Sequence, residues 1–295
     1  MDIVLAIAAA VFFAFGTVLQ QKAGLEKPAA GSSAGLLVQM ARRPVWLAGI
    51  AADALGFVCQ AVALAIGRLA VVQPLLVSTV VFALPLGARF TGQRVRRIDV
   101  AAALLVLVAL VAFLAIAEPS GGRDDAPLGE WLVAGAACAA ACVPLVLLGQ
   151  RGPAPRRAAF LGIATGVLFA LSAALTKVVA DQLDDELLGV FVHWQLYALI
   201  VVGYASMTFN QLALNTGALA PAVATSLAFD PITSVILGVT LLQESLHTTP
   251  AQLAGTMIAL AAALAGMAIL ARSQSQAQRV QAPAASATAS RIGGE

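Results

Sequence analysis

Long apolar runs, separated by short polar or Gly- and Pro-containing links, recur along almost the whole chain. A helix needs ~20 mostly apolar residues to cross a hydrocarbon core about 30 Å thick, and nine runs are long enough. Because the bilayer interior offers no water to backbone amides, each run is expected to be a helix. The predicted spans are residues 2–24, 45–66, 69–90, 98–117, 129–149, 158–180, 191–213, 219–242 and 251–271.

Two segments fall outside this pattern. Residues 31–40 are apolar but too short to cross, so we expect a loop or an interfacial helix there. Residues 273–295 are rich in Ser, Ala, Gln and Gly without periodicity, which predicts a disordered tail. The composition, 60% hydrophobic and 11% charged, excludes an ordinary soluble domain. The chain is therefore predicted to be an all-α polytopic membrane protein.

The basic residues indicate how the spans are oriented. When the links are assigned alternately to two sides, one side receives only three Lys or Arg residues: Arg68, Arg123 and Lys177. Basic links stay on the cytoplasmic face of a membrane. We therefore expect a multi-pass protein of the cytoplasmic membrane, with the N-terminus outside and the C-terminus inside.

An internal repeat relates the two halves of the chain. Residues 13–20 are similar to residues 169–176, and residues 63–70 are similar to residues 213–220. The copies begin at the first and the sixth predicted helix, an odd offset, so they should cross the membrane in opposite directions. Inverted repeats of this kind are typical of secondary transporters.

The repeat divides the chain into four predicted parts. Residues 1–118 form a first repeat of four helices, and residues 119–157 hold a linking transmembrane helix. Residues 158–272 form the inverted second repeat, and residues 273–295 form a cytoplasmic tail.

Polar residues within the apolar spans are the candidates for the transport pathway: Asp53, Gln60, Gln73, Asn210 and Asp230. A carboxylate at membrane depth costs at least ~2.5 kcal/mol, so it usually faces a cavity or a partner. Pro231 follows Asp230 and predicts a kink that frees backbone carbonyls. Gln60 lies opposite Asn210 in the repeat. The alternative is a role in folding, because an Asp can cap a half-helix and amides can join helices.

Other polar residues give no sign of a reaction centre. Cys59, Cys138 and Cys142 lie within apolar runs and are interpreted as packing residues, and no histidine has a second ligand at metal-binding spacing. No nucleophile, base and metal set and no glycine-rich phosphate loop occurs, so an enzyme is not expected. We expect no cofactor and no nucleic-acid partner, and the metal question stays open. Lys177, with Asp181 one turn later, is interpreted as a snorkelling residue in an ion pair.

Several apolar motifs resemble a known family. They are Pro44–Gly49, Gly56, Ala63–Ala65 and Leu69–Leu75 in the first half, and Pro231–Gly238 and Leu241–Glu244 in the second. Together they resemble the drug/metabolite transporter (DMT, EamA-like) superfamily, and most closely its NIPA-type magnesium transporter branch. The resemblance covers nearly the whole chain to about residue 271. It implies nine spans, an outside N-terminus and transport by alternating access.

The match to the magnesium branch has two departures. The branch would have a glutamate directly after Gly56, where this chain has Phe57, and Gln60 stands for an asparagine. Asp53, one turn earlier on the same helical face, would take the place of that glutamate. In the repeat, Arg94 lies opposite Glu244.

The sequence therefore predicts a secondary transporter of a small solute. A NIPA-like transporter of magnesium or another divalent cation is the alternative, and a non-transporting membrane protein or membrane enzyme is the third class. A homodimer is left open.

Overall fold

The computed structural model describes residues 1–25, 43–92, 95–117, 120–149, 152–185, 189–216, 218–245 and 249–292. In these ranges, nine helical segments are long and apolar enough to cross a membrane. The elements are α1 (Asp2–Leu25), α3 (Pro44–Ile66), α4 (Leu69–Leu76), α5 (Thr79–Thr91), α6 (Arg97–Ala117), β1 (Ser120–Gly121), α7 (Leu128–Gly149), α8 (Ala154–Asp185), η1 (Gly189–Val192), α9 (Trp194–Leu214), α10 (Leu219–Thr240), β2 (Glu244–Ser245) and α11 (Pro250–Ile292). The prediction of an all-α polytopic membrane protein is confirmed at this level.

Most predicted spans agree with the observed helices to within a few residues. α8 is longer than the predicted span 158–180, with 32 residues. α11 continues to Ile292, through most of the segment for which the sequence predicts disorder. That segment is rich in Ala and Gln, which are strong helix formers. Residues 31–40, the expected loop or interfacial helix, lie outside the described residues.

The third predicted span, 69–90, is the clearest difference, because it consists of two helices. α4 and α5 are separated by a turn at Val77 and Ser78. Pro74, inside α4 and one turn before this break, has no N–H to donate to the carbonyl four residues earlier, which weakens the helix there. The span is therefore a discontinuous helix.

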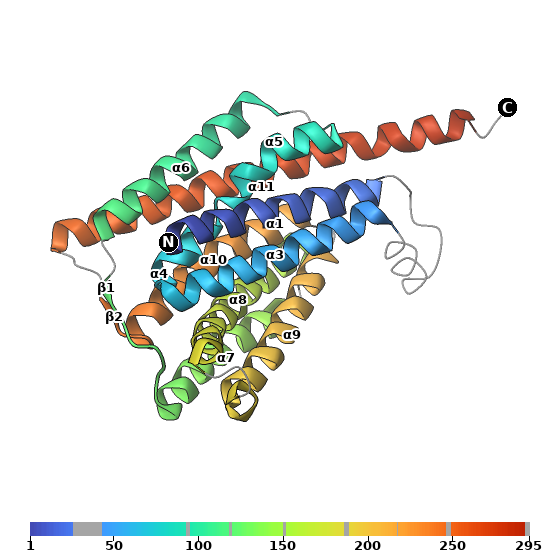
Figure 1. The fold of residues 1–295 in the computed structure, drawn as a ribbon. Helices are drawn as coiled ribbons and strands as arrows, with labels where there is room; N and C mark the ends of the chain where they lie inside the picture. The colour runs from blue at the N-terminus through green and yellow to red at the C-terminus, as the bar shows by residue number, and fades with distance from the viewer. Residues whose placement is uncertain are drawn as a thin grey trace.

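Two helices connect most of the molecule (Figure 1). α8 packs against α3, α7, α9 and α10, and α10 packs in turn against α4 and α11. The other major pairs are α1 with α3 and α6 with α11. The largest buried cluster contains residues from both halves, among them Leu64, Val72, Leu175 and Leu242.

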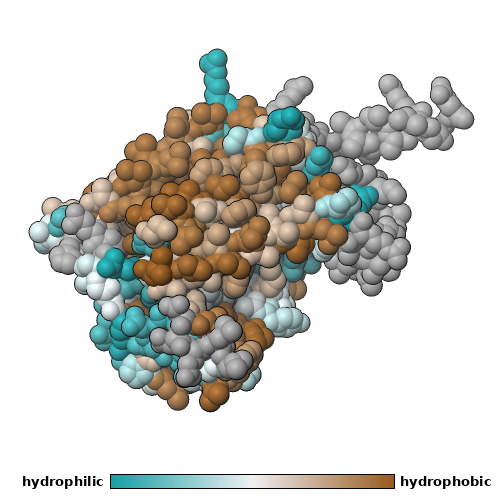
Figure 2. All heavy atoms as spheres, in the orientation of Figure 1, coloured by the Kyte–Doolittle hydropathy of each residue, from teal (hydrophilic) through white to brown (hydrophobic). Residues whose placement is uncertain are grey.

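The outside of this bundle is apolar. Large hydrophobic side chains such as Val108, Val201 and Tyr204 are more than half exposed. Apolar residues cover most of the face in Figure 2, and hydrophilic residues gather toward its edges. Such a surface suits lipid rather than water, as expected for a multi-pass membrane protein.

The links between spans meet at the end of the bundle that holds the N-terminus. There β1 pairs antiparallel with β2, so that Gly121 lies opposite Glu244. Gly67, in the link between α3 and α4, lies against Asp2, since a Cβ at Gly67 would be 2.6 Å from Cβ of Asp2. We call this end the N-terminal end.

Candidate functional site

The interruption of the third span is held by local hydrogen bonds. The Ser78 hydroxyl donates to the Leu75 carbonyl at 2.6 Å, and the Thr79 hydroxyl donates to the Leu76 carbonyl at 2.6 Å. The backbone N–H groups of Val77 and Ser78 donate three residues back, as in a 3₁₀ turn. A 3₁₀ stretch in the middle of a helix often marks a hinge. The Ser78 hydroxyl thus adds a second hydrogen bond to the Leu75 carbonyl, which also accepts from the Ser78 N–H, and the Thr79 hydroxyl binds the Leu76 carbonyl.

Gln73 lies one turn before this interruption and is buried, with 4% of its surface exposed. Its Nε2 atom has no hydrogen-bond partner among the described residues. An unsatisfied buried amide donor costs about 1–3 kcal/mol, so it calls for an explanation such as a ligand or an ordered water. This is the strongest polar irregularity in the interior of the third span.

α10 runs antiparallel to α4, which brings Asp230 to the level of the interruption. Ala70 lies beside Gly238, and each helix rises about 1.5 Å per residue from this contact. The segment from Asp230 to Ser234 lies four to eight residues from Gly238, as residues 74–78 do from Ala70. The register therefore sets this segment alongside residues 74–78 of the third span.

Asp230 is partly buried and accepts a hydrogen bond from the Ser234 hydroxyl at 3.3 Å. α8 approaches it closely, since a Cβ at Gly166 would lie 2.8 Å from the Asp230 nitrogen. Pro231 is buried inside α10, which continues through it without interruption. The observed break thus follows Pro74 in the third span, whereas α10 continues through Pro231.

Asp53 is paired with Gln20 across the contact between α1 and α3. The Gln20 side chain donates from Nε2 to Asp53 Oδ2. Two glycines let the helices approach: a Cβ at Gly16 would lie 1.8 Å from Asp53 Oδ1, and one at Gly49 would lie 2.9 Å from Cγ of Gln20. Gln20 thus gives the Asp53 carboxylate the polar partner that a carboxylate at membrane depth usually has.

The remaining predicted pathway residues lie apart from these two sites. Gln60 is on α3 and Asn210 is on α9, and both are partly exposed. The two helices pack mainly on other neighbours, α3 on α1 and α9 on α8. In the described part of the chain, no hydrogen bond joins two of the five predicted pathway residues.

A second polar site lies at the N-terminal end, where we define the polar junction as Arg68, Arg123, Lys177 and Glu244. Glu244 is 2% exposed, and its carboxylate accepts hydrogen bonds from the N–H groups of Leu69 at 2.6 Å and Ala70 at 2.9 Å. These are the first N–H groups of α4, where a carboxylate is favoured. Gly238 leaves room for it, since a Cβ there would be 2.5 Å from Glu244 Oε2.

Lys177 holds the other side of the same link. It is 8% exposed, and Nζ donates to the carbonyls of Leu64 at 2.9 Å and Gly67 at 2.7 Å. These carbonyls end α3, where a cation is favoured. Lys177 on α8 and Glu244 after α10 therefore clamp the link between α3 and α4 from the second half of the chain.

Burial raises the pKa of Glu244, while the N–H groups of Ala70 and Leu69 and the charges of Lys177 and Arg68 act to lower it. The net direction is upward from the ordinary value. Glu244 lies outside the spans, so it can exchange protons with the aqueous phase more readily than the residues within them.

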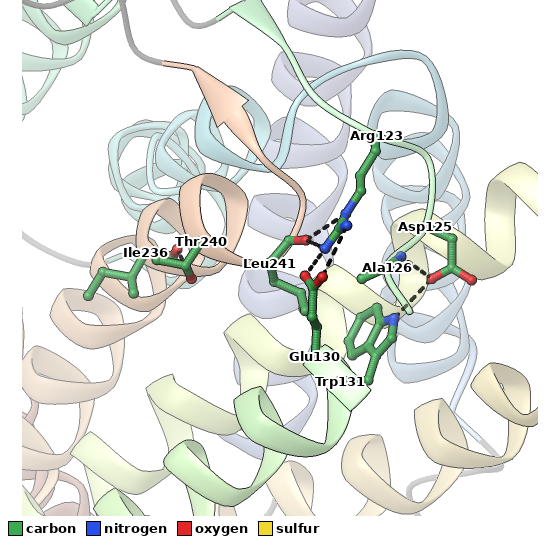
Figure 3. Close-up of polar contacts among 8 residues, drawn as sticks. All are labelled: Arg123, Asp125, Ala126, Glu130, Trp131, Ile236, Thr240 and Leu241. Carbon is green, nitrogen blue, oxygen red and sulfur yellow. Dashed lines mark hydrogen bonds and ion pairs between the residues drawn. The ribbon is translucent and has the colours of Figure 1, made fainter. Parts of the chain in front are cut away.

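The two arginines join the β1 segment to this site. Arg68 Nε donates to the Gly121 carbonyl at 3.2 Å. Arg123 donates to the Leu241 carbonyl from Nε at 3.0 Å and from Nη2 at 2.7 Å, and it forms an ion pair with Glu130 (Figure 3). The link before α7 is thereby tied to the end of α10.

Asp125 lies next to this ion pair. Its Oδ1 atom accepts from the Trp131 indole at 2.9 Å and from the Ala126 N–H at 2.7 Å (Figure 3). Its Oδ2 atom accepts from Gln195 on α9 at 2.6 Å. The N-terminal end of α7 is thus fixed to α9.

The sequence did not indicate the polar junction as a site. The available signals were a lysine inside an apolar span and Glu244, the last residue of the Leu241–Glu244 motif. The interpretation of Lys177 as a snorkelling residue missed its contacts with α3, because Leu64 and Lys177 are 113 residues apart.

The fold and these sites define an all-α membrane protein with polar groups in its interior. The chain is 31% identical over 246 residues to a protein of Corynebacterium glutamicum described as uncharacterized, covering 83% of this chain and 85% of that protein. It belongs to the same family as that protein. No protein-family model matches the chain. No solved structure matches it either.

Proposed function

We propose that this protein is a secondary transporter of a small polar solute that works by alternating access, as the DMT resemblance implies. The observation that carries the proposal is the discontinuous third span with the unpartnered amide of Gln73 buried beside it. Discontinuous helices near the bilayer midplane form the binding sites of many secondary transporters.

The helix pairs support an inverted repeat. In an inverted repeat, a two-fold axis in the membrane plane relates the two copies, which therefore cross the membrane in opposite directions. Equivalent helices that meet at this axis must run antiparallel. α6 and α11 are the last spans of the two predicted repeats, and they are antiparallel: Phe113 clusters with Leu260, and Val106 lies against Gly266. α4 and α10, from the third spans, are antiparallel as well.

The proposed pathway contains Gln73 and Asp230 at the level of the interruption. Gln73 offers a donor, and Asp230 offers a carboxylate that only Ser234 is seen to contact in the described residues. A solute with both an acceptor and a donor, or a cation, would satisfy this pair. Asp53, Gln60 and Asn210 remain candidates for other stages of the pathway, and Asp53 has the folding role described above.

The proposed location is the cytoplasmic membrane. The distribution of Lys and Arg supports an outside N-terminus, which would set the N-terminal end, with the polar junction, on the outer face. The solute and the lipid bilayer are the proposed partners.

Uptake into proteoliposomes tests the proposal. A panel of organic cations, metabolites and Mg²⁺ would be offered with and without a proton gradient. The Gln73→Leu and Asp230→Asn variants should lose flux of the transported solute, whereas Tyr204→Phe, on the lipid-facing side of α9, should keep it. Flux of Mg²⁺ that depends on Asp53 or Asp230 would favour the divalent-cation transporter instead. No flux of any compound by the correctly folded protein would overturn transport.

A further inference from the structure

A small cavity opens at the N-terminal end beside the polar junction. Its volume is about 180 Å³, below the ~300 Å³ at which pockets for drug-sized ligands begin. Side chains and backbone of four segments line it: the end of α3 with its link to α4, the β1 segment, α8 and β2. The charged lining residues are Arg68, Arg123, Asp124, Lys177 and Glu244.

Three of these charges are already occupied. Glu244 accepts from two backbone N–H groups, and Lys177 donates to two carbonyls. Arg123 is bound to Glu130 and to the Leu241 carbonyl. These residues form fixed walls.

The other two charged groups keep hydrogen-bonding atoms without a partner in the described residues, although the charge of Arg68 acts on Glu244 and the charge of Asp124 acts on Lys177. Arg68 uses only Nε, toward the Gly121 carbonyl, and its two terminal nitrogens have no partner among the described residues. Asp124 is exposed, and within the described ranges its carboxylate has neither a hydrogen bond nor an ion pair within 4.0 Å. Since the pair does not form an ion pair with each other, the cavity presents one open cationic group and one open anionic group.

We propose that this cavity binds a small zwitterion, with its carboxylate on the terminal nitrogens of Arg68 and its ammonium group on Asp124. The planar guanidinium matches a carboxylate with two parallel hydrogen bonds. An ammonium group has three donors for Asp124. A purely anionic ligand would leave Asp124 unpaired beside it, and a purely cationic ligand would do the same to Arg68.

This site is separate from the proposed mid-membrane pathway, and its occupation does not require transport. If the protein is a carrier, the cavity would be the first binding site on the face that holds the N-terminal end. Binding and flux can therefore fail independently.

Binding to the full chain in lipid nanodiscs tests the proposal, with three related probes: alanine, propionate, which lacks the ammonium group of alanine, and ethylamine, which lacks its carboxylate. Calorimetric titration should show alanine binding about tenfold or more tightly than either single-charge probe. Arg68→Gln should reduce alanine affinity to that of ethylamine, and Asp124→Asn should reduce it to that of propionate. Arg156→Gln, at the opposite end beside Phe160, should change nothing.

Unfolding temperatures of the variants provide the folding control, and Arg68→Lys gives a second variant that keeps the charge but loses the two parallel hydrogen bonds. It should bind alanine with intermediate affinity. Absence of alanine binding to the wild type, equal binding of propionate, or unchanged alanine binding by both Arg68→Gln and Asp124→Asn would each overturn the zwitterion site.

Discussion

Individual buried charges in this protein are satisfied mainly by the protein backbone. Glu244 accepts from the first N–H groups of α4, and Lys177 donates to the last carbonyls of α3. Asp99 accepts through Oδ2 from the Arg96 N–H at 2.7 Å, while its Oδ1 atom has no partner among the described residues. Such contacts fix the ends of helices, so a change in one charge is expected to act on a whole helix end.

Glu244 should make stability depend on pH. Its folded-state pKa is raised above the unfolded value, so the folded state binds the proton more tightly than the unfolded state. The contribution of Glu244 to the free energy of unfolding should therefore increase as pH falls from the raised pKa toward the unfolded-state pKa of about 4.3. Below that pH the contribution should level off. Thermal unfolding across this range should show the increase in the wild type and not in Glu244→Gln. An identical pH profile for the two proteins would contradict this assignment.

Gly16 should be intolerant of even one methyl group. In Gly16→Ala the new Cβ would overlap Asp53 Oδ1 and disturb its hydrogen bond with Gln20. Overpacking of this kind typically costs about 1–3 kcal/mol. The matched control is Gly135→Ala, where no atom lies within 4 Å of the added Cβ. Chemical unfolding in detergent should show a lower free energy of unfolding for Gly16→Ala only. Equal free energies of unfolding for the two variants would refute the close contact.

Among the elements, the third span differs most from a simple membrane helix. Pro74 precedes its interruption and Ser78 is part of it, and α4 is buried along almost its whole length. A buried, discontinuous helix at the contact of the two halves can transmit a change in one half to the other. This is the element on which the proposed transport depends.

Making the third span continuous should impair transport. The double variant Pro74→Ala and Ser78→Ala restores a backbone donor and removes the hydroxyl that satisfies Leu75. Removal of proline from a helix interior favours the helix by up to about 3 kcal/mol, so the fold should persist while flux falls. Pro144→Ala is the control, since Pro144 lies in α7 and faces outward. Unchanged flux in the double variant would show that transport does not depend on the interruption.

Hydropathy predicts the helices that need only an apolar environment along their length. Eight spans follow from apolar length alone, because a lipid-facing helix such as α7 needs nothing else. A proline in an apolar span can either kink a helix or end it, and the packing around the proline decides between the two. The interruption beside Pro74 therefore could not be predicted from the sequence alone. The contacts of Lys177 and Glu244 join residues more than 100 positions apart, and a single sequence carries no local signal for them.

The candidate site was predictable only in part. Gln73 and Asp230 stand out as polar residues in apolar spans, and the structure brings their segments to one level. Gln60 and Asn210 were paired by the repeat, yet they lie on helices with different main neighbours. Equivalent positions in a sequence repeat need not be in contact, because each helix can pack on neighbours other than its counterpart.

At the scale of the whole molecule, the polar junction ties the two halves together at one end. Lys177, Glu244 and Arg123 each bridge segments far apart in the chain, and β1 pairs with β2 beside them. If the protein alternates access, this end must separate when the opposite end closes. Weakening the polar junction should therefore increase the population of the form in which the N-terminal end is open.

Distances between spin labels at the two ends, measured by double electron–electron resonance, test alternating access most directly. Labels at the exposed residues Ile66 and Val192 report on the N-terminal end, and labels at Phe90 and Leu212 report on the other. The native cysteines would first be replaced by alanine. In Glu244→Gln we predict a new population with a longer first distance and a shorter second distance. Lengthening of both distances, or of the first alone, would contradict a carrier that exchanges access between its two ends.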